Sequence, residues 1–233
     1  MRSRFAKLVV ARLAFTKSLM PLVKRMHSPE RRAAIIREAL RLFAERGFRG
    51  TTTRELAAAV GVSEPVLYEH FRTKRELYDA IIEVKSCEGP ERLVALTGTA
   101  IHTGDDRGFF EGVASLMLDF YESNPDFVRL LMFSALESHE MGESFGQRYR
   151  EVLLTAIGGY IDRRVREGAF RKLDSSLTAR AFTGMVAHFG LHLVLFPTFV
   201  PKMDRKDLVR GMVDMFLQGV TRANQAPAKK RKR

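Results

Sequence analysis

The sequence predicts an all-α protein, in which a small N-terminal helical domain precedes a larger helical domain. The first observation behind this prediction is that apolar residues recur at the spacing of amphipathic helices, between short breaks of Gly, Pro, Ser and Asp. The second is that the chain lacks a series of segments in which apolar and polar residues alternate, as half-buried β-strands require. The third is that 233 residues with 45% hydrophobic side chains can bury the core of such a fold.

The first helix is expected to run from about Pro29 to Arg46. Ser28 can cap its N-terminus, proline suits the first helical position, and Gly47 can end it. Apolar residues between these ends fall on one stripe, so the helix can bury one face.

Three shorter helices are expected next, at 52–60, 63–71 and 74–84. Thr52 and Glu55 have the spacing of a capping box, in which each side chain bonds the backbone N–H of the other residue. Gly61 ends the first of these helices, and Ser63 and Thr73 can cap the two that follow.

The helices at 52–60 and 63–71 have the layout of a helix-turn-helix unit. Gly61 allows the sharp turn between them. Apolar residues of both helices can form one small core: Ala57, Val60, Val62, Leu67 and Phe71. The second helix then exposes a polar and aromatic face, as a helix that enters a DNA groove does.

This unit also carries short segments at fixed spacing: Thr52-Thr53-Arg54-Glu55-Leu56-Ala57, Gly61-Val62-Ser63, Leu67-Tyr68, His70-Phe71, Lys74 and Leu77. Together they resemble the signature of the tetracycline-repressor (TetR) family of bacterial transcription regulators, over roughly residues 30–85. The resemblance is specific because many positions match at once. It implies an N-terminal three-helix helix-turn-helix DNA-binding domain, whose helix at 64–71 lies in the major groove.

The resemblance implies two kinds of contact with double-stranded DNA. Side chains that would hold backbone phosphates are Thr52, Tyr68, His70 and Lys74. Side chains that would lie near base edges are Arg54, Glu64, Pro65 and Val66, and Thr53 belongs to the same surface. Arg54 can pair with guanine, Glu64 can accept from a cytosine amino group, and the apolar residues can touch a thymine methyl group.

The rest of the chain resembles the family only in architecture. After a looser stretch from Thr97 to Asp106, helices are expected at about 107–123, 126–140, 143–168, 175–196 and 204–222, with breaks at Pro125, Gly142, Gly168, Pro197 and Pro201. The resemblance implies that this larger domain binds a small-molecule effector and forms a homodimer, with 143–168 and 175–196 pairing against the same helices of the partner. A dimer is also expected because one recognition helix reads few bases, whereas a two-fold dimer reads both halves of a palindrome.

An effector pocket would be concave and mostly apolar, with a few polar groups. Candidate lining residues are Phe110, Met117, Tyr121, Phe133, Tyr149, His188 and His192. Most of them are more typical of plain core, because aromatic and Met residues at helical spacing usually pack other helices. His188 and His192 share one helix face at the spacing of a metal-binding pair, but no third ligand lies nearby in the sequence. We therefore expect no metal and no other cofactor.

Lys and Arg outnumber Asp and Glu by 39 to 27, which gives a net charge of +12 and a pI near 10.2. The excess lies at the two ends, because residues 1–27 and 222–233 contain basic side chains and no acidic ones. The high pI alone therefore does not indicate that the folded body binds nucleic acid. The expected organisation is a basic N-terminal extension at 1–27, the helix-turn-helix domain at 28–85, the effector-binding and dimerisation domain at 86–222, and a basic disordered tail at 223–233.

Two interpretations of the N-terminal extension remain open. It can form an amphipathic arm for the DNA backbone or a membrane surface, or translation can begin near Met20 or Met26. The basic tail can raise DNA affinity without sequence preference, by releasing counterions.

These features predict a cytoplasmic, homodimeric transcriptional regulator that is not an enzyme. It is expected to be a repressor that leaves a palindromic operator when a small ligand binds. Cys87 is the single cysteine, which excludes an intramolecular disulfide and fits a reducing compartment. No apolar run approaches the roughly 18 residues that span a bilayer, so no membrane partner is expected.

Other interpretations use residues outside the helix-turn-helix. Residues 142–146 match the nucleophile-elbow pattern, which would make Ser144 the nucleophile of a helical hydrolase with His139, but that pattern needs a preceding strand. A second form of this alternative is a helical protein that binds a ligand without hydrolysing it. Cys87 could act as a redox sensor, although a lone cysteine is usually inert. A non-specific DNA-binding protein would depend on the two basic ends alone.

Overall fold

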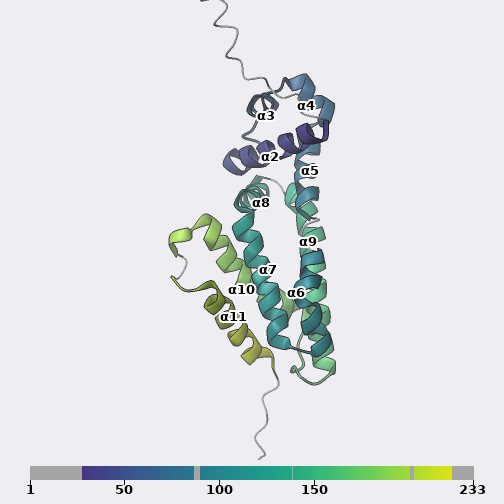
Figure 1. Cartoon of the computed structure of the whole chain (residues 1–233), viewed down its shortest axis with the longest axis vertical. Coiled ribbons are helices and arrows are strands. Elements are labelled where there is room, and N and C mark those ends of the chain that lie inside the picture. Colours follow the sequence, from purple (N-terminus) through teal and green to yellow (C-terminus); the bar gives the residue numbers. More distant parts are fainter. Residues whose placement is uncertain (1–27, 87–89, 138, 200–201, 222–233) are drawn as a thin grey trace, which may run out of the picture. The chain divides into compact units, whose positions relative to one another are not determined.

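The computed structural model describes residues 28–86, 90–137, 139–199 and 202–221. Over these residues the regular elements are ten α-helices and one short 3-10 helix, which confirms the all-α prediction (Figure 1). In chain order they are α2 Ser28–Arg46, α3 Thr53–Val60, α4 Glu64–His70, α5 Lys74–Ser86, α6 Pro90–Thr103, α7 Asp106–Ser123, α8 Pro125–Glu137, α9 His139–Arg166, α10 Ser175–Leu195, η1 Pro197–Phe199 and α11 Arg205–Val220. Among the helices of the described ranges, none is long and apolar enough to cross a membrane.

The prediction of a looser stretch at 97–106 is wrong, because α6 continues to Thr103. Thr97 is buried and its hydroxyl donates to the Leu93 carbonyl one turn earlier, at 2.7 Å. Leu93 and Ala100 belong to the buried core of the larger domain. Packing of this face therefore outweighs the low helix propensity of the threonine and glycine residues in the segment.

The helix break predicted at Gly142 is also wrong, because α9 begins at His139 and runs through Gly142 to Arg166. A glycine inside a helix costs only about 1 kcal/mol relative to alanine, which a helix of this length can absorb. By its internal contacts the chain divides between Ala34 and Ile35, and every predicted DNA contact belongs to the unit that starts at Ile35. The basic extension at 1–27, the tail at 223–233 and Cys87 lie outside the described residues.

Helices α2 to α5 share a buried core that is distinct from the core of the larger region, and α8 contributes side chains to it. Ala57, Leu67 and Phe71, from the predicted helix-turn-helix core, are each 2% exposed, and the other two predicted members pack against them partly buried. Phe127 and Leu130 of α8 belong to the same buried cluster. Because a helix of the larger region contributes to this core, the domain border at residue 85 stays a prediction.

Aromatic side chains from α7, α9, α10 and α11 meet in the larger core. Phe110 is fully buried, and its ring centroid lies 4.8 Å from that of Phe182 and 4.7 Å from that of Phe216. Phe109 stacks on Tyr160 with the ring centroids 3.9 Å apart. These contacts join four helices of the larger region through one cluster of rings.

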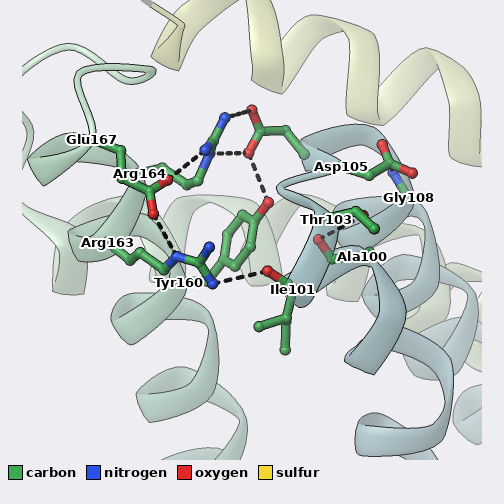
Figure 2. Close-up of polar contacts among 10 residues, drawn as sticks. Ala100, Ile101, Thr103, Asp105, Gly108, Tyr160, Arg163, Arg164 and Glu167 are labelled. Carbon is green, nitrogen blue, oxygen red and sulfur yellow. Dashed lines mark hydrogen bonds and ion pairs between the residues drawn. The ribbon is translucent and has the colours of Figure 1, made fainter.

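A polar network joins the start of α7 to the end of α9. Figure 2 shows Arg164 and Tyr160 converging on one carboxylate, which belongs to Asp106. Arg164 donates to both oxygens of Asp106, at 2.7 and 3.0 Å, and also bonds Glu167. Burial and then the hydrogen bond to Asp106 raise the pKa of Tyr160 above its usual value, so the phenol stays protonated. The network therefore holds the α6–α7 turn against α9 with charge-assisted hydrogen bonds.

Candidate nucleic-acid interface

The turn between α3 and α4 depends on Gly61. Its φ of 75° lies in the left-handed region, which residues with a Cβ adopt only at a cost. The N–H of Gly61 donates to the Ala58 carbonyl at 3.1 Å, and that of Val62 donates to the Ala57 carbonyl at 3.0 Å. An added Cβ at Gly61 would meet no atom within 4 Å, so the backbone angle, and not a lack of space, requires glycine there.

The N-terminus of α3 carries the predicted capping box. The Thr52 hydroxyl accepts from the Glu55 N–H at 3.2 Å, and the Glu55 carboxylate accepts from the Thr52 N–H at 2.8 Å. The Thr52 N–H, the Thr52 hydroxyl and the neighbouring Arg46 guanidinium, in that order, lower the pKa of Glu55. Thr52 is exposed, so the positive end of the helix dipole is accessible beside its hydroxyl.

A short chain of hydrogen bonds joins α3 to α4 across the exposed face of the unit. The Thr53 hydroxyl donates to Glu64 Oε2 at 3.0 Å, and the Tyr68 hydroxyl donates to Thr53 Oγ1 at 3.4 Å. Tyr68 is 45% exposed even though its ring is large. The sequence did not predict this link, because the spacing of Thr53 and Glu64 has no meaning until the turn brings the two helices together.

The other predicted contact residues on α3 and α4 are open to solvent to different degrees. Arg54 and Pro65 are exposed, and Val66 is half-buried. Within the described residues Arg54 forms no ion pair, so its guanidinium is available. Hydrogen bonds thus join Thr53, Glu64 and Tyr68 across the two helices. We use the name recognition surface for these three together with the other predicted contact residues of α3 and α4: Thr52, Arg54, Pro65 and Val66. His70, half-buried, ends α4 next to it.

Lys74 begins α5 and turns its ammonium toward the chain between α2 and α3. The Nζ atom donates to the carbonyl oxygens of Phe48 and Thr51, at 2.7 and 2.8 Å, and lies 4.2 Å from the centroid of the Phe48 ring. Burial lowers the pKa of Lys74. Two of the three N–H donors of the ammonium are therefore engaged by the protein, which leaves one for a phosphate.

Two models of known protein families match parts of this chain. The family model "Bacterial regulatory proteins, tetR family" matches residues 35–81, and the model "AefR-like transcriptional repressor, C-terminal domain" matches residues 112–219. The nucleoid occlusion factor SlmA of Sodalis glossinidius is 32% identical over 149 residues, which cover 61% of this chain and 74% of that protein. The chain belongs to the TetR family.

Two further TetR-family proteins match different shares of the chain. The class C tetracycline repressor of Escherichia coli is 52% identical over 52 residues, which cover 22% of this chain and 24% of the repressor. The crystal structure of PfmR from Thermus thermophilus matches with a TM-score of 0.62 and 25% identity, covering 81% of this chain and 96% of PfmR. Proteins of the TetR family are DNA-binding transcriptional regulators and not enzymes, and they typically act as dimers with small-molecule effectors.

TetR membership does not decide what Lys74 contributes, but its contacts allow a prediction. We expect Lys74→Met to lower the free energy of unfolding by about 1–2 kcal/mol, because it removes two charge-assisted hydrogen bonds to carbonyl oxygens. Urea unfolding measures the change, and Lys206→Met, at an exposed lysine of α11, is the control. Equal stability of the two variants would contradict the structural role.

The predicted effector-pocket residues of this TetR-family chain have different surroundings. Phe110 and Met117 are buried in the larger core. Phe133 is half-buried, and its ring lies 3.3 Å from where a Cβ at Gly47 would be. Tyr121 is half-buried and packs so closely on Gly190 that an added Cβ would lie 2.2 Å from its ring. The side chain of Tyr149 lies outside the described residues, so the pocket stays a prediction.

The two remaining candidates, His188 and His192, lie on α10, where His188 is exposed and His192 is half-buried. Their ring centroids are 4.3 Å apart, and Nδ1 of His192 lies 2.8 Å from the carbonyl oxygen of His188. One imidazole nitrogen is therefore used by the backbone of the helix itself. Among the described residues, no group of three or more His, Cys, Asp or Glu could hold a metal ion.

The hydrolase alternative conflicts with the backbone around Ser144. Residues 142–146 lie inside α9, whereas a nucleophile elbow places its serine on a sharp turn after a strand. TetR membership argues against the same alternative, since these regulators are not enzymes.

Proposed function

We propose that the chain is a homodimeric repressor that reads a palindromic operator and leaves it when a small apolar or amphipathic ligand binds the larger region. The observation that carries the proposal is the recognition surface, where hydrogen bonds link Thr53, Glu64 and Tyr68 across α3 and α4 and where Arg54 and Tyr68 are exposed.

The contacts on DNA follow from the chemistry of this surface. Arg54 would pair with guanine O6 and N7, and Glu64, oriented by the Thr53 hydroxyl, would accept from a cytosine amino group. Pro65 and Val66 would touch a thymine methyl group. Phosphates would be held by the remaining predicted residues: Thr52, Tyr68, His70 and Lys74.

Dimer formation is proposed for the exposed faces of α9 and α10. Leu177 on α10 is 68% exposed and Val152 on α9 is 47% exposed. Exposed apolar side chains and glycines line both helices at the spacing of one face, which a second copy of the chain could bury. A two-fold axis through this contact would present the two recognition surfaces to the two halves of a palindrome.

Ligand release is proposed by population shift. The ligand would bind a conformation in which the two recognition surfaces no longer fit successive major grooves, and its preference for that conformation limits the loss of affinity. The match of residues 112–219 to the C-terminal domain of an AefR-like repressor supports repression.

A second candidate function is nucleoid occlusion, which is favoured by the name of the Sodalis relative. Both functions need sequence-specific DNA binding, so one experiment tests their common basis. Chromatin immunoprecipitation then separates them. Occupancy confined to a few promoter regions would support the local repressor, and occupancy that is not confined to promoters would support nucleoid occlusion.

The test is selection of randomised duplex DNA by the full chain at about 150 mM salt, where surface charges are already partly screened. The wild type is expected to enrich a palindrome, and the double variant Arg54→Ala, Tyr68→Ala is expected to lose that enrichment. Arg210→Ala, at an exposed arginine of α11, is the control and should enrich the same palindrome. Equal, unselective binding by the wild type and the double variant would instead assign DNA binding to the basic ends.

A further inference from the structure

We propose that Glu137, the last residue of α8, is a positioning residue for operator binding. Its carboxylate fixes the α2–α3 loop, residues 47–51, and through that loop it holds Thr52 and the N-terminus of α3 at the DNA backbone. The inference rests on the proposed function, because it names the residue through which the larger region reaches the recognition surface.

Glu137 bonds the loop through its backbone N–H groups. The carboxylate accepts from the N–H of Phe48 at 3.0 Å and from that of Arg49 at 3.2 Å. These hydrogen bonds connect residues that are almost 90 positions apart in the chain. A Cβ on Gly47 would lie 2.2 Å from Glu137 Oε1, so glycine at this position is what lets the carboxylate approach.

The other side of the same loop is held by a cation. Lys74 donates to the carbonyl oxygens of Phe48 and Thr51, while Glu137 binds the N–H groups. The Thr51 side chain is buried, and its hydroxyl donates to the Gly47 carbonyl at 2.9 Å. A loop held on both its N–H and its carbonyl groups can place the next residue, Thr52, with little freedom.

Helix α8 makes a second contact one turn before Glu137. The hydroxyl groups of Ser134 and Tyr78 lie 2.5 Å apart and both side chains are buried. The Tyr78 ring packs edge-on against the Phe48 ring, with centroids 5.7 Å apart. The end of α8 therefore touches α5 and the loop together, and a shift of α8 would disturb both.

The position of Glu137 in its own helix supports a role outside that helix. A carboxylate in the last turn faces the negative end of the helix dipole, which is unfavourable. The hydrogen bonds from Phe48 and Arg49 offset this cost only while the loop stays in place. A change in the larger region that moves the end of α8 would thus reach Thr52 without any contact with α4.

The experiment compares the full-length wild type with Glu137→Ala, Glu137→Gln and Asp126→Asn. Asp126 is the matched control, because it lies on α8 and pairs with Arg129 instead of the loop. Affinity is measured for the selected operator and for an unrelated duplex of equal length at the same salt. Hydrogen exchange of the Phe48 and Arg49 amides is followed in the free protein.

Glu137→Ala is expected to weaken operator binding about tenfold, from the loss of hydrogen bonds to a charged acceptor. The change on the unrelated duplex should be smaller, because a displaced α3 also moves Arg54 away from the base that it is proposed to read, whereas phosphate contacts carry no sequence information. Glu137→Gln keeps one acceptor oxygen and should lie between this variant and the wild type, and it serves in its place should the alanine variant fail to fold. Asp126→Asn should match the wild type. The Phe48 and Arg49 amides should exchange faster in Glu137→Ala.

Two results would overturn the inference alone: an unchanged ratio of operator to unrelated affinity in Glu137→Ala, or unchanged exchange of the two amides. A global loss of folded protein would lower both affinities equally, so the ratio separates positioning from stability. A wild type without any operator preference would instead overturn the proposed function, and this inference with it.

Discussion

Phe110→Ala is expected to lower the free energy of unfolding by about 3–5 kcal/mol, the range found when a buried phenylalanine is truncated. The ring is fully buried, and the ring centroids of Phe182 and Phe216 lie 4.8 and 4.7 Å from its own. Because these partners come from α10 and α11, the cavity would lie where α7 contacts both helices. The structure around it can close only by moving whole helices, which keeps the cost high.

Thermal unfolding should show this loss as a fall in melting temperature of about 10 °C for a chain of this size. Met215→Ala is the control, because Met215 lies on α11 with 63% of its surface exposed and should change stability by less than about 0.5 kcal/mol. A similarly small change for Phe110→Ala would mean that its ring packs loosely. That outcome would favour the effector-pocket role predicted for Phe110 over a core role.

The helix-turn-helix unit could be predicted from the sequence because its determinants are local. The capping box needs only the spacing of Thr52 and Glu55, and the turn needs only a residue that tolerates the φ of Gly61. The buried positions follow from the helical period alone. Each of these signals acts over a few residues, and all of them agree on one structure.

The errors in the larger region have the opposite cause. The helix over Thr97 exists because Leu93 and Ala100 pack on the core, and no local signal in the segment favours a helix strongly. The role of Glu137 could not be predicted either, since its partners come from a loop almost 90 residues earlier. One signal was present: an acidic residue at a helix C-terminus, where the dipole disfavours it.

The second large effect is expected from a substitution within the proposed dimer contact, which should change both dimer formation and operator binding. Gly184 lies on the exposed stripe of α10 with Leu177, Ala181 and His188, and a Cβ added there would meet no atom within 4 Å. An arginine at this position therefore fits the single chain, and it also has the better helix propensity. It would not fit a partner helix packed on the same stripe, because helix axes in contact lie only about 8–10 Å apart.

We expect Gly184→Arg to keep the thermal stability of a folded protomer, to sediment as a monomer, and to bind the operator at least about 100-fold more weakly, since one half-site supplies too few contacts. Gly211→Arg is a matched control, because Gly211 is an exposed glycine of α11 with equally open space around its Cβ. The control should stay dimeric and bind normally. A dimeric Gly184→Arg beside a monomeric Gly211→Arg would place the contact on α11 instead. A monomer that still bound the palindrome with wild-type affinity would show that the two half-sites are read independently, and the symmetry argument for the operator would then be lost.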